Sequence, residues 1–441
     1  MKNYKAIHLI FLLIVSLLNT VVAQNPIIRD QFSADPTARV FNGKVYLYPS
    51  HDIPTPPGKN LRKNWFCMED YHVFSSENLT DWTDHGVIVT QTKVPWLTNI
   101  NYDMWAPDCV FKNDKYYFYF PVGGRIGVAT ADKPEGPYSI LDKPVEGIRG
   151  IDPCVLIDKD GQAYIFTAMG RISVAKLKGN MIETDGQPQT IANLPAKGLI
   201  EGPFAFELNG RYYLTYPHVE NKIERLEYAI SDSPLGPYKQ VGVIMDESPS
   251  GCWTNHQSIV RYKGQWYLFY HDKDYSPNFD KNRSVRVDSL SFNSDGTIRK
   301  VIPTLRGVGI ADASKKIDID RYSQISNKGV SIAFLDTLNT FKGWKTIFDK
   351  QNAWIQYNTV DFGNKKLKSV RIEALSQTGG TLQIRIDKAD GILLAEVKIP
   401  KGTGWNSVDK RLSKYQKGIH NLVVVLKDNN PVEVDWIRFV K

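Results

Sequence analysis

Cysteine is scarce in this chain, which has four cysteines among its 441 residues. None belongs to a Cys-x-x-Cys pair, so a zinc site of the usual cysteine type is not expected. Two of the four follow equivalent positions of the repeat described below. The sequence leaves two alternatives open, disulfide bonds or buried free thiols. The cysteines are Cys67, Cys109, Cys154 and Cys252.

Long hydrophobic runs are also missing. The apolar run at residues 9–18 is too short to span a bilayer, which takes about 20 residues. Lys2 and Lys5 precede this run and Val21-Val22-Ala23 follows it, which is the pattern of a secretory signal peptide over residues 1–23. The residue directly after the expected cleavage site is Gln24, not a cysteine. We therefore expect an exported protein without a lipid anchor or a membrane span.

A cluster of charges of one sign is absent as well. The net charge of +8 is spread along the chain. A nucleic-acid-binding face needs a basic stripe, so nucleic acid is not an expected partner. An anionic polysaccharide is compatible with this charge.

The chain does contain a repeat. Its clearest copy is the stretch from Phe204 to Tyr216, where an apolar strand, a turn at Asn209-Gly210 and an aromatic strand predict a β-hairpin. The pattern occurs five times, with turns at 42–43, 113–114, 160–161, 209–210 and 263–264. A third strand is expected after each hairpin, at 71–75, 126–129, 172–175, 226–229 and 284–287.

Five repeats of about 40–50 residues predict an all-β fold, a five-bladed β-propeller over residues 24–305. A β-sandwich with accidental internal similarity is the alternative. In a propeller the first strand of each blade lines the central channel, so the residues just before these strands lie around one opening.

Several residues suited to chemistry occupy these positions. At one position of the repeat stand Asp35, Ala106, Asp152, Gly202 and His256, and one residue earlier stand Ala34, Trp105, Ile151, Glu201 and Asn255. The repeat therefore predicts that two aspartates, a glutamate, a histidine and a tryptophan meet at one mouth. A purely structural repeat has no need of carboxylates there.

Residues 27–305 resemble glycoside hydrolase family 43 through motifs that occur in the family's order. They are Asp35-Pro36, Trp105-Ala106-Pro107-Asp108, Ile151-Asp152-Pro153 and Glu201-Gly202-Pro203, with Tyr71-His72-Val73-Phe74-Ser75 and Arg283-Ser284-Val285. The resemblance implies hydrolysis of a glycosidic bond by two carboxyl groups. A separation of roughly 6.5–9.5 Å between them would leave room for a water and invert the anomeric configuration.

The resemblance also implies roles for the three carboxyl groups. Asp35 would be the general base that activates water, and Glu201 the general acid that protonates the leaving oxygen. Asp152 would orient Glu201 and raise its pKa by like-charge proximity.

Three further residues are expected to bind substrate. The resemblance implies that Arg283 contacts the sugar, with Arg286 as the less favoured candidate. It implies that His256 contributes, through waters, to a Ca²⁺ site near the axis, while a hydrogen-bonded core histidine is the alternative. Trp105 can stack on a sugar ring or simply pack in the core. No organic cofactor is expected.

Residues 51–70 form a long insertion inside the first repeat, with several prolines, Trp65 and Phe66. A long irregular segment in a compact domain is often functional. We expect it to wall the pocket, and a plain surface loop is the alternative.

The rest of the chain changes character. Residues 306–325 show little strand pattern and are expected to be a linker, whereas alternating strands over 326–441 predict a β-sandwich of the jelly-roll type. This second part resembles carbohydrate-binding module family 6. The resemblance rests on Tyr357, Val360-Asp361-Phe362-Gly363, Gly379-Gly380-Thr381-Leu382, Gly404-Trp405 and Val434-Asp435-Trp436-Ile437.

The second part departs from its family pattern in two places. Glu433 stands where the family has a ligand-binding asparagine, and residues 323–326 replace an opening motif that helps to hold a structural calcium. Trp405 remains as a candidate for stacking on sugar. The domain is expected either to bind polysaccharide or to brace the propeller.

We expect an exported bacterial enzyme, periplasmic or secreted and monomeric. The pairing of the two domains resembles arabinofuranosidases, which implies removal of α-L-arabinofuranosyl residues from arabinan, arabinoxylan or pectin side chains. A β-D-xylosidase or xylan-acting enzyme on the same scaffold is the alternative. A non-catalytic carbohydrate-binding propeller and a sucrose- or fructan-cleaving enzyme are rivals of other kinds, and exo or endo action is left open.

Overall fold

Five antiparallel sheets follow one another along residues 34–290 of the computed structural model, which describes residues 25–198 and 200–441. The predicted signal peptide lies outside the described residues. The sheets are β1 (Ala34–Phe41), β2 (Lys44–Ser50), β3 (Asp70–Ser76) and β4 (Thr83–Thr90); β5 (Asp108–Lys112), β6 (Lys115–Val122), β7 (Arg125–Ala131) and β8 (Ser139–Ile140); β9 (Ile151–Ile157), β10 (Ala163–Ala168), β11 (Ile172–Leu177) and β12 (Thr184–Thr190); β13 (Phe204–Leu208), β14 (Arg211–Val219), β15 (Glu224–Ser231) and β16 (Lys239–Met245); and β17 (Ser258–Tyr262), β18 (Gln265–Asp272) and β19 (Ser284–Leu290).

The predicted hairpins and third strands are present in every sheet. The first two strands of each sheet are joined by the turn that the repeat predicted, for example between Leu208 and Arg211. Asn42, Asn113 and Asn209 adopt φ values of 50°, 51° and 54° there, a left-handed conformation that asparagine tolerates better than most residues. The third strands are β3, β7, β11, β15 and β19.

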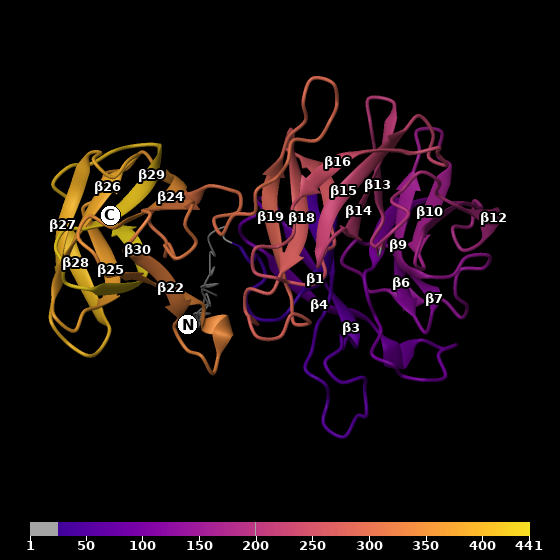
Figure 1. Cartoon of the computed structure of the whole chain (residues 1–441), viewed down its shortest axis with the longest axis horizontal. Coiled ribbons are helices and arrows are strands. Elements are labelled where there is room, and N and C mark those ends of the chain that lie inside the picture. Colours follow the sequence, from indigo (N-terminus) through magenta and orange to yellow (C-terminus); the bar gives the residue numbers. More distant parts are fainter. Residues whose placement is uncertain (1–24, 199) are drawn as a thin grey trace, which may run out of the picture.

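Apolar side chains between the sheets hold the domain together. One buried cluster joins the first and second sheets, a second joins the second and third, and a third joins the third, fourth and fifth. A further cluster, which contains Leu47 and Phe269, joins the fifth sheet back to the first. The packing therefore runs around the domain and returns to its start, as a propeller requires (Figure 1).

Strands dominate throughout. The described parts of the chain contain no α-helix, and their helices are two short 3₁₀ segments, η1 (Gln91–Lys93) and η2 (Thr340–Lys342). None of the helices in these ranges is long and apolar enough to cross a membrane. All four cysteines are buried free thiols and not disulfide-bonded.

The second domain consists of two facing sheets with one core between them. One sheet has the strand order β20-β24-β29-β26-β27, with β21 beside β24, and the other has the order β22-β23-β30-β25-β28. The strands are β20 (Ala311–Asp312), β21 (Gln324–Ile325), β22 (Val330–Phe334), β23 (Trp344–Phe348), β24 (Trp354–Asp361), β25 (Ser369–Leu375), β26 (Gly380–Ile386), β27 (Leu393–Ile399), β28 (Asn406–Arg411), β29 (Ile419–Leu426) and β30 (Val432–Val440).

The segment 306–325 differs from the expected linker. Its strand β20 pairs in parallel with β24, and Ile317 forms a bridge with Ile437. Ile317 and Ile319 are fully buried in the core of the second domain. The segment therefore belongs to the sandwich, because its few apolar residues find partners far along the chain.

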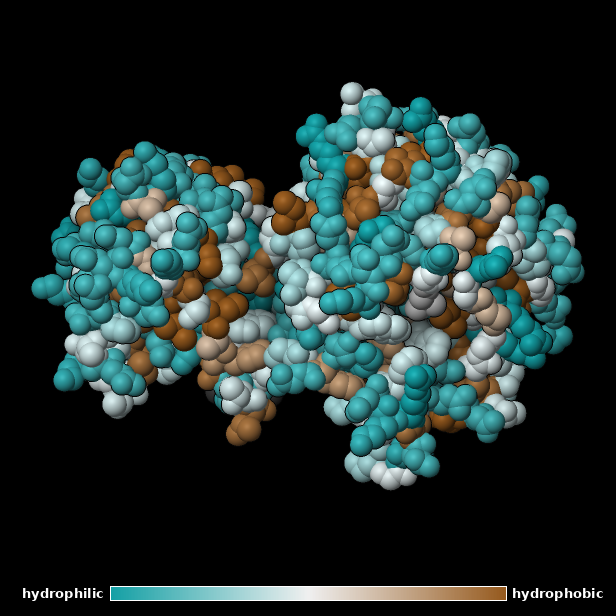
Figure 2. Space-filling view, in the orientation of Figure 1, coloured by the Kyte–Doolittle hydropathy of each residue, from teal (hydrophilic) through white to brown (hydrophobic). Residues whose placement is uncertain are grey.

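The two domains pack directly against each other around Arg321. This buried side chain donates hydrogen bonds to the Asn25 carbonyl and to the Tyr275 hydroxyl of the first domain. Its guanidinium lies 4.1 Å from the ring centroid of Trp344, which in turn stacks on Tyr275. The space-filling view shows two lobes joined at a narrower waist (Figure 2).

Candidate active site

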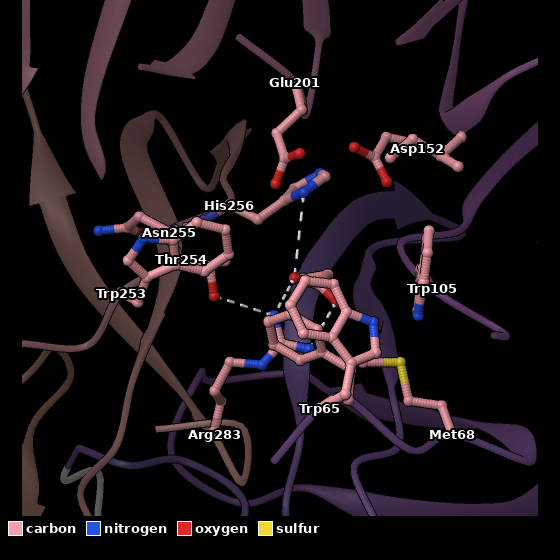
Figure 3. Close-up of a pocket in the computed structure, with 13 residues that line it drawn as sticks. Trp65, Met68, Trp105, Asp152, Glu201, Trp253, Thr254, Asn255, His256 and Arg283 are labelled. Atoms are coloured by element: carbon pink, nitrogen blue, oxygen red, sulfur yellow. Dashed lines mark hydrogen bonds and ion pairs between the residues drawn. The ribbon is translucent and has the colours of Figure 1, made fainter. Parts of the chain in front are cut away.

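A pocket of about 160 Å³ lies where the strands of the first domain begin. It collects residues from separate sheets and from the insertion at 51–70 (Figure 3). The predicted residues Asp35, Trp105, Asp152, Glu201, His256 and Arg283 all line it, together with Trp65, Phe66, Met68, Ile151, Trp253, Thr254 and Asn255.

A shared backbone conformation explains why the repeat brings these residues together. Asp35, Asp152 and Gly202 occupy equivalent positions, and their φ values are 45°, 53° and 49°. Aspartate tolerates this left-handed region and glycine adopts it freely. Each of the three is followed by a proline, and Gly202 stands directly after Glu201. The same turn therefore brings Asp35, Asp152 and Glu201 to one place.

Asp35 is a buried carboxylate with a full set of partners. It accepts a hydrogen bond of 2.7 Å from the Ser50 hydroxyl, and Arg283 donates to both of its oxygens at 2.7 and 3.1 Å. Burial by itself raises the pKa of this carboxyl. The Arg283 guanidinium, with smaller contributions from two histidines and Ser50, outweighs that effect and lowers the pKa to about 2. Asp35 is therefore ionised at neutral pH.

Arg283 has no hydrogen-bond donor left for a sugar. Beyond its bonds to Asp35, it donates to both oxygens of Asp52 at 2.9 Å each and to the Thr254 hydroxyl at 3.3 Å. A guanidinium has five N–H groups, and these bonds use all of them. The geometry therefore makes Arg283 a positioning residue for Asp35 rather than the direct sugar contact that the resemblance implied.

Glu201 and Asp152 have the opposite electrostatic character. Figure 3 shows their carboxyl groups turned toward each other, with Arg283 on the other side of the pocket. Burial is the main cause that raises the pKa of each, and the negative charge of Asp35 raises both further. Glu201 also raises the pKa of Asp152, and Asp152 accepts a hydrogen bond of 3.0 Å from the Gly202 N–H. Asp152 thus holds the backbone beside Glu201.

A further carboxyl group, Glu224, lies behind Glu201. Its side chain is fully buried at the start of β15 and accepts a hydrogen bond from the Asn255 N–H. Burial, followed by the charge of Glu201, raises the pKa of Glu224 well above its usual value. The raised pKa favours the neutral form of this buried carboxyl.

His256 lies beside Asp35, with 4.0 Å between its Nδ1 and a carboxylate oxygen. Burial lowers the pKa of its imidazole to about 4, so the ring is neutral and could coordinate a metal. Ca²⁺ takes six to eight ligands, nearly all oxygen. Among the described residues, the groups of three possible metal-binding side chains do not include His256. The described protein residues would therefore supply fewer than three ligands, and water the rest.

The insertion forms an aromatic wall of the pocket, as predicted. Trp65 and Phe66 line the cavity, and both lie 6.5 Å from Trp253 between ring centroids. The Arg62 guanidinium stacks on Trp65 at 3.4 Å, and Lys281 lies over Phe66 and Trp253. One side of the pocket is thus acidic and the other aromatic.

Two candidates lie outside this cavity lining. Arg286 pairs with Asp274 and Asp272, so the less favoured arginine is engaged elsewhere. Trp405 belongs to the second domain, where 38% of its surface is exposed. Glu433, which replaces the family's asparagine, is held by Lys345 at 2.7 Å.

Sequence reasoning missed Asp52, Glu224 and Trp253. None stands in the repeated position that revealed the other carboxylates. Asp52 is the second residue of the irregular insertion, and Glu224 is the first residue of a third strand, a position at which the other sheets have Asp70, Arg125, Ile172 and Ser284. A list of acidic residues next to the predicted strands would have contained both, without a reason to choose them.

The comparisons with known proteins agree with this geometry. Residues 23–298 match the family model described as "Glycosyl hydrolases family 43", and residues 325–441 match "Carbohydrate binding module (family 6)". A xylosidase/arabinosidase 43A from Humicola insolens is 36% identical over 62% of this chain and 98% of its own length. An arabinoxylan arabinofuranohydrolase from Bacillus subtilis is 27% identical over 91% of this chain and 88% of its own.

Solved structures give the same result. A family 43 β-xylosidase/α-arabinofuranosidase from a compost microbial metagenome, in complex with xylotriose, aligns with a TM-score of 0.57 at 32% identity, over 64% of this chain and 98% of that one. A Bacillus subtilis arabinoxylan arabinofuranohydrolase in complex with cellotetraose aligns with a TM-score of 0.57 at 25% identity, over 96% of this chain and 99% of that one. The chain, a β-propeller followed by a β-sandwich, therefore belongs to glycosyl hydrolases family 43.

Proposed function

We propose that the protein is an inverting glycoside hydrolase that removes α-L-arabinofuranosyl side chains from arabinoxylan or a related plant polysaccharide. Asp35 is the general base, Glu201 the general acid and Asp152 the residue that orients Glu201. The observation that carries the assignment is the electrostatic contrast in one pocket, where the pKa of Asp35 is lowered to about 2 and that of Glu201 is raised.

The contrast matches what hydrolysis needs. Protonated Glu201 gives its proton to the glycosidic oxygen as the bond to the anomeric carbon breaks. Ionised Asp35 takes a proton from a water, whose oxygen attacks the same carbon from the opposite face. The free sugar leaves with inverted configuration, and one proton has passed from Glu201 to the leaving group and one from water to Asp35.

The size of the pocket supports removal of a terminal residue. Its volume of about 160 Å³ is well below the roughly 300–1,000 Å³ of sites for drug-sized ligands. A single sugar ring fits such a space better than an internal stretch of a chain. The aromatic wall of Trp65, Phe66 and Trp253 offers apolar surface to one face of that ring.

The choice of arabinofuranose rests on the second domain. The arabinoxylan arabinofuranohydrolases align with both domains, over 91% and 96% of the chain, whereas the xylosidase/arabinosidase aligns with the first domain only. The alternative is a β-D-xylosidase, since the relative with 36% identity is named for both activities, a xylosidase/arabinosidase.

The test is release of nitrophenol from the α-L-arabinofuranoside and the β-D-xyloside by the full chain, side by side. Faster release from the arabinoside, with arabinose freed from arabinoxylan, is expected. Faster release from the xyloside would replace the proposal by its alternative. Sugar binding without turnover on glycosides and polysaccharides would favour a carbohydrate-binding propeller, and sucrose hydrolysis a fructan-cleaving enzyme. Proton NMR of the first product should show the inverted anomer.

Further properties belong to the same proposal. The five sheets are the blades of the propeller, and the protein is an exported monomer. His256 is a protein ligand of a hydrated Ca²⁺ ion, which would add positive charge near the carboxyl groups and on which no step above depends. Calcium titration by calorimetry checks this last point, and equal binding by the His256→Ala variant would contradict it.

A further inference from the structure

A second group of side chains that can bind a metal lies outside the pocket lining, where the two ends of the insertion meet. His51, Asp70 and His72 each offer one ligand atom, and these three atoms lie within 4.8 Å of one another. All three side chains are half-buried. The insertion at 51–70 starts and ends at this group and carries Trp65 and Phe66 to the pocket.

The strand register explains why the three meet. β2 and β3 pair with Val45 opposite Ser76 and Leu47 opposite Phe74. The next bridge joins Asp52 to Met68, and just before it His51 and Asp70 lie side by side, with 2.7 Å between His51 Nδ1 and an Asp70 oxygen. His72 stands two residues after Asp70 and therefore lies on the same face.

The hydrogen bonds leave a nitrogen of His72 for a ligand. His51 Nδ1 lies 2.7 Å from an Asp70 oxygen, and the two histidine rings are 5.1 Å apart. His72 Nδ1 lies 3.1 Å from both oxygens of Asp84. Within residues 25–198 and 200–441, Nε2 of His72 has no hydrogen bond to protein. A carboxylate on one ring nitrogen and a free second nitrogen is the usual arrangement of a metal-binding histidine.

A comparison inside the molecule shows what is special about this group. His218, Glu220 and Glu227 also lie within ligand distance of one another. There, however, Arg225 donates to Glu227 at 2.7 Å, so a positive charge already occupies the position of a cation. In the described chain, the ion pairs of Asp70 and Asp84 are with histidines alone.

We propose that His51, Asp70 and His72 bind one divalent transition metal ion, for which zinc is the best match. Two imidazole nitrogens and one carboxylate oxygen are ligands that zinc accepts in tetrahedral sites, with water in the fourth position. Oxygen-seeking Ca²⁺ and Mg²⁺ are disfavoured by the two nitrogens. The site is independent of the calcium considered for His256.

The metal would fasten the two ends of the insertion. Next to the site, the Ile53 N–H donates to the Cys67 carbonyl at 2.9 Å and Asp52 bridges to Met68. A bond from each strand to one ion would reinforce this short ladder. The aromatic wall beyond it, with Trp65 and Phe66, would then be held more firmly over the pocket.

Calorimetry of the full chain, stripped of metal by a chelator and titrated with zinc, tests the proposal. One zinc per chain is expected for the wild type, and none for His51→Ala or His72→Ala. Asp84→Asn should bind about 10–100-fold more weakly, because Asp84 only orients His72. His420→Ala is the matched control: His420 also pairs with an aspartate, Asp387, at 3.0 Å, but among the described residues it belongs to no group of three possible metal ligands. This control should bind zinc normally.

Proteolysis supplies a readout that does not depend on activity. Lys59, Arg62 and Lys63 lie inside the insertion and are potential trypsin sites. Zinc should slow cleavage there in the wild type and have no effect in His72→Ala. If His72→Ala fails to fold by circular dichroism, His72→Gln replaces it. No zinc binding by the wild type, equal binding by both histidine variants, or equal cleavage rates with and without zinc would overturn the proposal.

Discussion

The guanidinium of Arg283 donates two hydrogen bonds to Asp35, of 2.7 and 3.1 Å, and it also donates to Asp52. The arginine thus joins the proposed catalytic base to the root of the insertion. A buried pair of this kind costs about 3–5 kcal/mol when one partner is removed, because an uncompensated charge remains.

Arg283→Lys should therefore raise the pKa of Asp35 from about 2 toward its ordinary value. Activity needs ionised Asp35, so kcat/KM should begin to fall at a higher pH than in the wild type as the solution is acidified. The matched control is Arg286→Lys, a buried arginine that pairs with Asp274 away from the pocket. This control should be less stable than the wild type, but its kcat/KM should begin to fall at the same pH on acidification. An unchanged acidic limb in Arg283→Lys would contradict this role.

Glu201→Gln and Asp35→Asn should each lower kcat on arabinoxylan by about 10²–10⁴-fold, the usual size of general acid or base catalysis. Circular dichroism should show both variants folded. The activities of the two variants should differ on an aryl glycoside with a dinitrophenolate leaving group, because this group leaves without a proton. Glu201→Gln should recover much of its rate there and Asp35→Asn should not. Normal turnover by either variant on arabinoxylan would refute the assignment.

The three carboxyls Asp152, Glu201 and Glu224 all have raised pKa values. The folded protein therefore binds more protons than the unfolded chain once the pH exceeds the ordinary carboxyl range, and stability falls as the pH rises through this window. Glu224→Gln mimics the neutral acid and removes its share of that loss. Its melting temperature should fall less between pH 5 and 8 than that of the wild type. Parallel curves would show that Glu224 is not protonated in the folded state.

Substitutions of Trp405 and Arg321 distinguish between the two roles considered for the second domain, which are sugar binding and bracing of the propeller. If the sandwich binds polysaccharide through Trp405, Trp405→Ala should reduce retention on arabinoxylan in affinity electrophoresis and leave the melting temperature unchanged. If the domain braces the propeller, Arg321→Ala should lower the melting temperature, since Arg321 bonds to Asn25 and Tyr275 across the interface. The structure leads us to expect the second effect, and a stable Arg321→Ala variant would argue against a brace.

The repeat predicted the centre of the site because its recurring features are set by residues that are neighbours in the sequence. Asn-Gly-type turns and the left-handed position shared by Asp35, Asp152 and Gly202 depend on neighbouring residues alone. Ile317 could not be placed in the same way. Its partner Ile437 lies far along the chain, and two isoleucines, Ile317 and Ile319, that alternate with charged residues are too short a pattern to predict a strand. Asp52 and Glu224 were hidden because burial, which sets their chemistry, is a property of the folded chain.

The attachment of Asp52 to Arg283 has a consequence for protein engineering. Exchange of the 51–70 insertion between relatives is an obvious way to alter which sugars fit the aromatic wall. Such a graft, if it began at residue 51, would also replace the carboxylate that receives Arg283 through three hydrogen bonds from its main chain and side chain. The donor segment should therefore begin after Asp52, so that a new wall can be introduced without disturbing Asp35, the proposed general base.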